Sequence, residues 1–450
     1  MAKDTLNSKT AEEIETIISR IQNDVSGGNY DFSKCDSIIL NHDGKKRYVK
    51  EYKDIYSTES IMCLYIKHIL DRTFRVRYPN RNKSVRELLN VLTAVKQMGA
   101  FTIVKFDFKD YFNSVSAPYV FEKFIRPQMS NRFEISLISD FVSNTKYAYA
   151  GLVTSNVLSE IVAKSFDDEV RKAFILKGIL FFERYIDDGI IIFNEDVPID
   201  DIQDVLNRSL EKAYLDTSLV VQPKCKTRFN HDKFFHVTRK DITSTSISFD
   251  YLGYEVFICK GTGRRNKPII EMTYGITQSK QEKYKKRVCD FITLFADPAS
   301  VDYQNIEMLR HRLSAFASRT VYQGNKFNTP VWKVKGFIAN YGELRYLLDT
   351  GQVDSRTVDY LKTLLESAFV ATGTDLPHFL KSEQSRAGYN LYDNMRKNKT
   401  LLFVERIGYD YDSLSKKCGQ IGIKTVDKDG KRRGYGTMVR EYLIKTKVGY

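Results

Sequence analysis

Three aspartates in this sequence have the residue types and surroundings needed for metal-dependent phosphoryl transfer. Asp187 and Asp188 are adjacent and lie between two apolar runs, and Asp107 follows a third apolar run, 101–106. Carboxylates beside apolar segments are costly to bury unless a positive charge lies between them, and their hard oxygens suit Mg²⁺ or, alternatively, Mn²⁺. Two-metal phosphoryl transfer needs carboxylates from different strands that converge on cations about 3.5–4 Å apart. The three aspartates are therefore predicted to be both the catalytic residues and the metal ligands.

The residues around these aspartates predict the elements that position them. The runs 179–186 and 190–193 are rich in β-branched and aromatic residues, and their junction at Asp-Asp-Gly is typical of a tight β-hairpin. The run 101–106 is expected to form a neighbouring strand. Amphipathic helices are expected over 201–214 and, near the N-terminus, from a cap at Thr10.

Five segments together resemble the sequence motifs of reverse transcriptases. They are the first palm motif (Asp107–Phe112), the second palm motif (Ala150–Ile161), the signature hairpin (Tyr185–Asp188), a loop with a Lys-Thr pair (Val220–Thr227) and the primer-grip hairpin (Phe249–Tyr254). All five occur in the order found in that family. The resemblance implies a right-hand polymerase core with fingers and a palm, and it implies dNTPs as substrates.

The resemblance also implies a set of nucleotide-binding residues. An aromatic residue at the place of Phe112 lies under the sugar in this family and excludes a 2′-hydroxyl, although Phe112 could instead simply pack. Phe108 of the same motif is assigned to the nucleotide site as well. Gly151 is implied to bring the backbone close to the incoming base pair. Lys226 is implied to lie near the pyrophosphate leaving group, with an ordinary surface lysine as the alternative.

The second palm motif departs from the family pattern. Tyr149 and Ala150 stand where the family has Pro-X, and Asn156 replaces a second proline. These departures favour an unusual mechanism over ordinary templating. Two further acidic positions, Asp110 and the pair 167–168, are expected to be structural.

A basic segment precedes the first palm motif. Residues 72–86 contain six basic residues and no acidic one. Guanidinium groups in the fingers of a polymerase can hold triphosphate oxygens and template phosphates, and Arg77, Lys83 and Arg86 are the candidates for this role. A solvated surface is the alternative interpretation.

Length and composition point to a two-domain protein with a polyanionic partner. The chain has 450 residues, a formal net charge of +14 and a pI near 9.2, which favours nucleic acid over membrane. No apolar run approaches the roughly 20 residues of a membrane span, and the N-terminus lacks the apolar core of a signal peptide. Six cysteines without paired metal spacing indicate reduced thiols in a cytoplasmic protein.

The pattern changes after a basic, turn-rich junction that begins at Lys260. Helical periodicity then dominates, so the predicted fold is α+β overall: a fingers and palm domain over 1–260, followed by an all-α domain over 261–450. Such a helical domain resembles the abortive-infection (Abi) polymerases and related defence-associated, unknown-group reverse transcriptases of bacteria. The resemblance implies a role in antiphage defence and a homo-oligomer. Some relatives also attach the first nucleotide to a tyrosine of the polymerase itself.

The C-terminal tail is strongly basic. From Lys416 onward it contains ten basic and three acidic residues, with tyrosines 435, 442 and 450 near Lys431–Arg433. Phosphate binding with aromatic stacking is one hypothesis for this tail, and a disordered solubilising tail is the other.

The sequence therefore predicts a metal-dependent DNA polymerase that acts in antiphage defence. It either copies a dedicated non-coding RNA or makes untemplated, protein-primed single-stranded DNA. The alternatives are a retron or mobile-element reverse transcriptase, and a non-catalytic scaffold of the same fold that binds nucleic acid through its basic surface.

Overall fold

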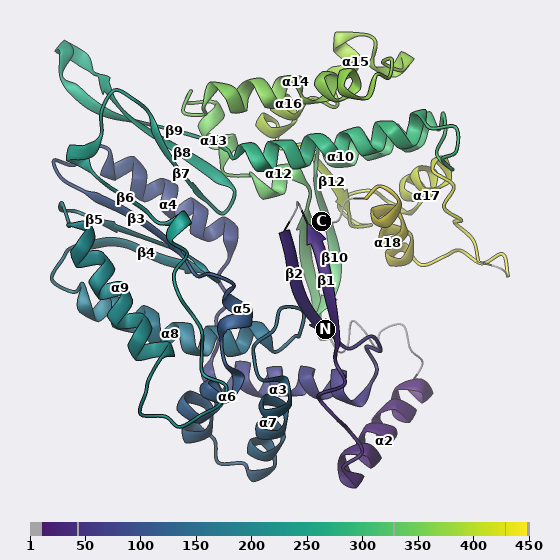
Figure 1. Ribbon diagram of the computed structural model, residues 1–450. Coiled ribbons are helices and arrows are strands. Elements are labelled where there is room, and N and C mark those ends of the chain that lie inside the picture. Colours follow the sequence, from purple (N-terminus) through teal and green to yellow (C-terminus); the bar gives the residue numbers. More distant parts are fainter. Residues whose placement is uncertain (1–10, 43–44, 327–328, 428, 448–450) are drawn as a thin grey trace. The chain divides into compact units, whose positions relative to one another are not determined.

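The computed structural model describes residues 11–42, 45–326, 329–427 and 429–447 (Figure 1). The chain divides into two compact units, Met1–Ile242 and Thr243–Tyr450. The division falls earlier than residue 260, where the turn-rich junction had suggested a boundary, so the predicted primer-grip hairpin belongs to the C-terminal unit.

A four-stranded antiparallel sheet with the order β4-β5-β3-β6 forms the centre of the N-terminal unit. Its strands are β3 (Thr102–Asp107), β4 (Ile179–Tyr185), β5 (Asp188–Phe193) and β6 (Phe235–Thr238). The predicted strand at 101–106 and the predicted hairpin are confirmed. One detail differs, because Asp188 is the first residue of β5 and the two-residue turn consists of Ile186 and Asp187.

Two helices, α8 (Ser155–Ala173) and α9 (Ile199–Tyr214), cover one face of this sheet (Figure 1). Their apolar side chains share a core with Val104 and Phe106 of β3 and with Phe108 of the first motif. Successive side chains of a strand point to opposite faces, so Lys105 and Asp107 project from the other face of β3. Helix α9 confirms the amphipathic helix predicted at 201–214.

The other elements of the N-terminal unit surround this sheet. Helix α2 confirms the predicted N-terminal helix, although its expected cap, Thr10, lies outside the described residues. Strands β1 and β2 form a separate antiparallel hairpin. The elements are α2 (Ala11–Gly27), β1 (Asp36–His42), β2 (Lys45–Glu51), α3 (Thr58–Phe74), α4 (Arg81–Val95), α5 (Tyr111–Ser114), α6 (Ala117–Val120), a π-helix (Phe121–Ile125), α7 (Arg132–Thr145), and short 3₁₀ helices at Arg126–Gln128, His231–Lys233 and Arg239–Asp241.

The prediction of an all-α C-terminal domain is wrong. The C-terminal unit contains two three-stranded sheets, with the orders β7-β8-β9 and β11-β10-β12. The strands are β7 (Ile247–Tyr251), β8 (Tyr254–Thr262), β9 (Pro268–Ile276), β10 (Arg319–Lys326), β11 (Thr329–Lys335) and β12 (Thr400–Phe403). In β9, Ile270, Met272 and Tyr274 are buried at a period of two residues, which is the pattern of a strand with one covered face. The β7–β8 turn at Leu252 and Gly253 confirms the predicted hairpin.

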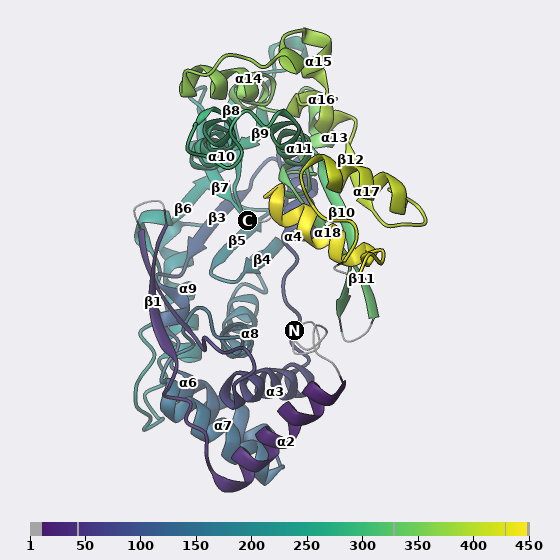
Figure 2. The same cartoon turned by 90° about the vertical axis from the view of Figure 1, so that its right-hand side faces the viewer.

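Helices nevertheless make up much of the C-terminal unit. The long helices α10 and α14 lie side by side in both views (Figures 1 and 2). The bounds are α10 (Gln278–Ala296), α11 (Ile306–Phe316), α12 (Phe337–Asn340), α13 (Leu344–Leu348), α14 (Ser355–Thr372), α15 (Glu383–Ala387), α16 (Leu391–Arg396), α17 (Tyr411–Gln420), α18 (Tyr435–Lys445), and 3₁₀ helices at Arg264–Asn266 and His378–Leu380.

The described part of the basic tail, 416–427 and 429–447, is folded, contrary to the alternative of a disordered tail. Helices α17 and α18 pack in one core with β12 (Figure 2). Tyr442 is only 1% exposed, and the hydroxyl of Tyr435 donates a 2.6 Å hydrogen bond to the carbonyl of Tyr409. These two tyrosines therefore build the core and are not free to stack on bases. Tyr450 lies outside the described residues.

Two further expectations concern cysteines and membranes. All six cysteines are free, as their spacing predicted. In the part of the chain that the structure describes, none of the helices has the length and apolar character needed to cross a bilayer.

His311 of α11 joins α17 and α18 within the C-terminal core. Its Nδ1 lies 2.8 Å from the Tyr442 hydroxyl and its Nε2 lies 3.1 Å from Oε1 of Gln420. Because Oε1 can only accept, this geometry fits a neutral ring with the proton on Nε2. Burial lowers the pKa of His311 below its ordinary value of 6.5, and the nearby Lys417 adds to this effect.

We predict that acidification destabilises the C-terminal unit through His311. A folded-state pKa below the unfolded value means that the stability present above pH 6.5 is lost as the pH falls towards the folded-state pKa. The loss is at most about 1.4 kcal/mol per pH unit, the limit for one proton. Urea unfolding of the wild type between pH 7.5 and 5.5 should show a steeper loss than the His311→Gln variant. Replacement of the exposed His378 by Gln should leave the pH dependence of the unfolding free energy as in the wild type. If both variants change this pH dependence equally, the prediction is contradicted.

Candidate active site

Antiparallel pairing brings two of the three predicted catalytic aspartates together. In the β3–β5 register, Asp107 lies directly opposite Asp188, so the two side chains project from the same face of the sheet. Asp187 occupies the β4–β5 turn, where its carbonyl accepts a 3.1 Å hydrogen bond from the backbone N–H of Phe108. The chain thus ties the turn to the residue that follows Asp107.

The environment of Asp188 disfavours its negative charge. Burial raises the pKa of Asp188 to about 7; the charges of Asp187 and Asp107 add to the rise, and Lys105 opposes it. Nζ of Lys105 is 4.0 Å from Oδ1 of Asp188, which is beyond hydrogen-bonding range. That oxygen is buried and has no hydrogen-bond partner in the described part of the chain. A buried carboxylate oxygen without a partner is costly, and a bound cation would remove this cost.

Asp107 has two partners that the sequence analysis did not identify. Nζ of Lys233 lies 2.7 Å from Oδ2 of Asp107, and the side-chain amide of Asn230 donates a 3.2 Å hydrogen bond to Oδ1. Burial lowers the pKa of Lys233, but the hydrogen bond to Asp107 and the three carboxylates raise it more. Lys233 thus supplies positive charge at the carboxylates. Its position, six residues after the Lys-Thr pair, carries no periodicity or motif that could have revealed it.

The carboxylates fit a hard divalent cation by their chemistry. Carboxylate oxygens are the ligands that Mg²⁺ takes in proteins, and the unbonded Oδ1 of Asp188 is available as a ligand. Among the described residues, no three His, Cys, Asp or Glu side chains are grouped closely enough to form a ready-made metal cage. The metal site at Asp107, Asp187 and Asp188 stays a prediction.

A buried arginine supports the turn from the opposite face of the sheet. Arg184 of β4 lies 2.9 Å from Oε2 of Glu160 and 2.9 Å from Oδ1 of Asp167, both on α8, and donates a 2.7 Å hydrogen bond to the carbonyl of Ile186. Ile186 has a φ of 61°, which is unfavourable for a β-branched residue. The guanidinium therefore fixes the strained residue that precedes Asp187. Asp167 is structural, as predicted.

The Gly151 loop contacts strand β2. The backbone N–H of Lys50 donates a 2.8 Å hydrogen bond to the carbonyl of Ala150, and Nζ of Lys50 lies 4.3 Å from the ring centre of Tyr149. Gly151 has a φ of +99°, and a β-carbon there would collide with the Lys50 carbonyl and with Val49. Close approach of two backbones, rather than φ alone, therefore requires a glycine. Sequence analysis missed Lys50, although its strand is rich in basic residues.

Lys226 lies beside the same loop. Its backbone N–H donates a 2.8 Å hydrogen bond to the carbonyl of Ser114 at the end of α5, and its Nζ is 5.4 Å from the ring centre of Tyr147. The rings of Tyr147 and Tyr149 are 5.8 Å apart. Lys50, Tyr149, Tyr147 and Lys226 thus form a cation–tyrosine cluster next to Gly151. Phe112 of α5 is half-buried, with its ring 5.8 Å from that of Tyr111.

The assignment of Phe108 to the nucleotide site is wrong for its side chain. The ring is 1% exposed and stacks between Tyr111 and Phe229, at centroid distances of 5.0 and 5.2 Å. Strand alternation turns this ring to the helical face, away from Asp107. Phe108 contributes through its backbone N–H, which binds the carbonyl of Asp187.

Two of the three predicted triphosphate-binding residues lie in a groove that the carboxylates do not line. Arg77 and Lys83 line a groove whose other walls are α8 and β4, and none of the three aspartates lines it. Arg86 lies on α4, where it is exposed. Triphosphate binding by these residues stays a prediction.

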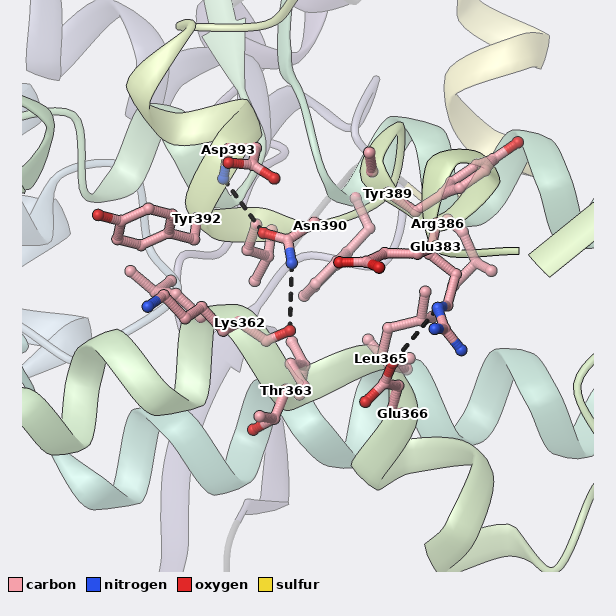
Figure 3. Close-up of a pocket in the computed structure, with 17 residues that line it drawn as sticks. Lys362, Thr363, Leu365, Glu366, Glu383, Arg386, Tyr389, Asn390, Tyr392 and Asp393 are labelled. Carbon is pink, nitrogen blue, oxygen red and sulfur yellow. Dashed lines mark hydrogen bonds and ion pairs between the residues drawn. The ribbon is translucent and has the colours of Figure 1, made fainter. Parts of the chain in front are cut away.

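A separate cavity of about 460 Å³ lies in the C-terminal unit between α14, α15 and α16 (Figure 3). Its polar groups largely bind one another: Arg386 pairs with Glu366 at 3.3 Å, and the side chain of Asn390 bridges the Lys362 carbonyl and the Asp393 N–H. Figure 3 shows these contacts along the cavity wall. The arrangement holds three helices together and presents no reactive pair.

Comparisons with known proteins give only distant likenesses. No protein-family model matches the sequence, and no curated protein matches it. Similar solved structures include telomerase from Candida tropicalis in complex with a TWJ fragment of telomeric RNA (9% identity, TM-score 0.38, 92% of this chain and 64% of that chain). Telomerase from Candida albicans with the same kind of fragment is 12% identical, with a TM-score of 0.34 and coverage of 91% and 65%. This chain thus spans less than two thirds of either telomerase chain, and the likeness adds no weight to a functional assignment.

We predict that Arg184→Met destabilises the protein by about 3–5 kcal/mol, because two buried carboxylates lose their partner. Arg184 has a side-chain exposure of 4%. The matched control is Arg126→Met, which breaks a 3.0 Å pair with Glu122 but concerns a side chain that is 61% exposed. Such a surface pair contributes less than about 1 kcal/mol. Urea unfolding measures both variants, and equal losses would refute a special role for Arg184.

We predict that Gly151→Ala displaces β2 from the loop and costs about 1–3 kcal/mol. Hydrogen exchange of the Lys50 amide should become faster, because its bond to Ala150 is disturbed. Gly28→Ala is the control, since Gly28 also has a positive φ (+69°) but a β-carbon there would meet no atom within 4 Å. If both variants leave exchange at Lys50 unchanged, the close approach does not require glycine.

Proposed function

We propose that this chain is a metal-dependent DNA polymerase of the reverse-transcriptase type, which adds dNTPs by phosphoryl transfer. The observation that carries the proposal is the cross-strand pair of Asp107 and Asp188 beside a turn that holds Asp187. The turn is fixed from both sides, by the N–H of Phe108 and by the guanidinium of Arg184. Carboxylates presented by two neighbouring strands are what two-metal phosphoryl transfer requires.

The residues of the chain have distinct roles in this proposal. Asp107, Asp187 and Asp188 would hold Mg²⁺ or Mn²⁺. When bound, the metal lowers the pKa of the attacking hydroxyl and neutralises charge on the leaving pyrophosphate. Because the pKa of Asp188 is raised, a metal ion would compete with a proton for this carboxylate. Lys233 balances the charge of Asp107.

The dNTP is proposed to bind beside α5 and the Gly151 loop. Phe112 would lie under the sugar and select against NTPs. Gly151 would border the incoming base pair through its backbone, with β2 packed where its β-carbon would lie. Lys50 and Lys226 of the cation–tyrosine cluster supply positive charge at the same loop and suit the phosphates of a nucleotide.

The biological role is proposed from the resemblance of the sequence to defence-associated reverse transcriptases. The partner is either a dedicated non-coding RNA template or a single-stranded DNA product attached to the protein. The net charge of +14 supports a nucleic-acid partner. A homo-oligomer in the cytoplasm is part of the same proposal.

The test is incorporation of single labelled dNTPs by the purified full-length protein with Mg²⁺ and without added template or primer, with and without nuclease treatment. Asp187→Ala/Asp188→Ala should lower incorporation at least about 100-fold. The matched control is Asp200→Ala/Asp201→Ala, which removes an adjacent pair of exposed aspartates in α9. Parallel reactions with labelled NTPs test the role of Phe112.

The outcomes separate the mechanisms. Label that survives nuclease and leaves the protein only on proteolysis supports protein-primed, untemplated synthesis. Incorporation only when co-purified RNA is spared supports a templated reverse transcriptase. Incorporation that persists in the Asp187→Ala/Asp188→Ala variant, or none by the wild type in the presence of its RNA, would refute the assignment and favour a non-catalytic scaffold.

A further inference from the structure

We propose that a groove on the α8 side of the N-terminal unit is a binding site for single-stranded nucleic acid, separate from the carboxylates. The groove has a volume of about 1,020 Å³ and is lined by residues 73–80 and parts of α8 and β4. Small-molecule sites usually enclose about 300–1,000 Å³, so this groove is large enough for more than one nucleotide.

Exposed cations line the groove from two sides. Six basic residues with exposed side chains face it: Arg75, Arg77, Lys83, Lys164, Arg171 and Lys172. For Arg75, Arg77 and Lys164 the described residues offer no ion-pair partner. Most of the acidic lining is already engaged, since Glu160 and Asp167 bind Arg184, and Glu169 binds Lys172 and Lys212. The free charge in the groove is therefore positive.

The first wall is the irregular segment 75–80, which follows α3. Arg75 ends α3 in the left-handed region, with a φ of 47°. Phe74 and Val76 pack against the core, so the alternate residues, Arg75 and Arg77, project outwards. The hydroxyl of Tyr78 donates a 2.6 Å hydrogen bond to Asp71 and secures the end of the segment. Both guanidinium groups are thus exposed on the same side of the segment, where they could bind neighbouring phosphates.

The second wall is one face of α8. Lys164, Arg171 and Lys172 lie seven and eight residues apart, a spacing that places them on one side of a helix. The guanidinium of Arg171 stacks on the ring of Phe182 at 4.5 Å and donates a 3.0 Å hydrogen bond to its carbonyl. This cation is also held in place towards the groove.

The groove runs along the edge strand β4, and none of the three aspartates lines it. Phe182 and Arg184, which line it, point to the α8 side, whereas Asp107 and Lys105 project from the other face. A ligand in this groove therefore does not occupy the candidate active site. The proposal goes beyond the polymerase function and does not depend on catalysis.

The chemistry of the groove selects a flexible polyanion. Rows of exposed lysines and arginines bind phosphates without sequence preference, and the exposed aromatic residue Tyr78 offers a ring on which a base could stack. The apolar lining is too sparse for a hydrophobic partner helix. RNA and DNA share the phosphodiester chemistry, and the experiment distinguishes them.

The test measures binding of fluorescein-labelled U15 RNA and T15 DNA (about one OB-fold site in length) to the nuclease-treated full-length protein by anisotropy. EDTA is present and nucleotides are absent, so the result is independent of catalysis. The triple variant Arg75→Gln/Arg77→Gln/Lys164→Gln should bind at least about tenfold more weakly. Its plot of log affinity against log salt should be shallower by about 2, because each lost phosphate contact contributes about 0.7 for a single strand.

The control variant Lys34→Gln/Arg132→Gln/Arg208→Gln removes the same charge from exposed residues outside the groove. This control should keep the wild-type slope of log affinity against log salt. Both variants should keep the unfolding midpoint of the wild type. If the triple variant binds both oligomers more weakly than the wild type, the groove recognises phosphates. If its affinity for RNA falls more than its affinity for DNA, the groove also recognises RNA through its 2′-hydroxyls. The proposal would be overturned if the groove variant and the control variant had equal affinities and salt slopes, or if the wild type bound neither oligomer.

Discussion

The buried guanidinium of Arg184 is the interaction on which the geometry of the candidate active site depends. One side chain binds two carboxylates of α8 and the carbonyl of Ile186. It thereby joins helix α8, the edge strand β4 and the β4–β5 turn. A buried charge is stable only when its partners are complete, so loss of any member disturbs the whole group. Ile186 has a left-handed conformation and precedes Asp187. Arg184 binds the carbonyl of Ile186, and the N–H of Phe108 binds the carbonyl of Asp187, so both residues of the turn are held.

Because side chains alternate along the strands, one face of the sheet packs against helices and the other carries the carboxylates. In β3, Val104, Phe106 and Phe108 enter the core with α8 and α9, while Lys105 and Asp107 project from the opposite face. The same rule in β4 turns Phe182 and Arg184 to the helical side. The three aspartates therefore do not line the basic groove along β4. A nucleic-acid strand in the proposed groove would leave the aspartates accessible.

Sequence patterns predicted the local elements around the site well. The hairpin at Asp187, the strand before Asp107, helix α9 and the turn at Leu252 and Gly253 were all confirmed, since each depends on neighbouring residues. Long-range partners could not be predicted. Lys233 meets Asp107 across more than a hundred residues, and Phe108 is buried because of rings from distant segments. The C-terminal sheets were missed because helical periodicity nearby concealed short strands such as β12, which pairs in parallel with the distant β10.

The sequence by itself determined the identity and order of the motifs, the basic charge and the chemistry that three aspartates can support, because these depend only on residue type and local spacing. Tertiary structure alone decided which cations reach the site. Register placed Asp107 opposite Asp188, and the approach of β2 to the Gly151 loop brought Lys50 to Tyr149. It also placed Arg77 and Lys83 in a groove with α8 that the carboxylates do not line. The physical reason is that a contact between distant segments is set by how sheets and helices pack, and no local pattern encodes that packing.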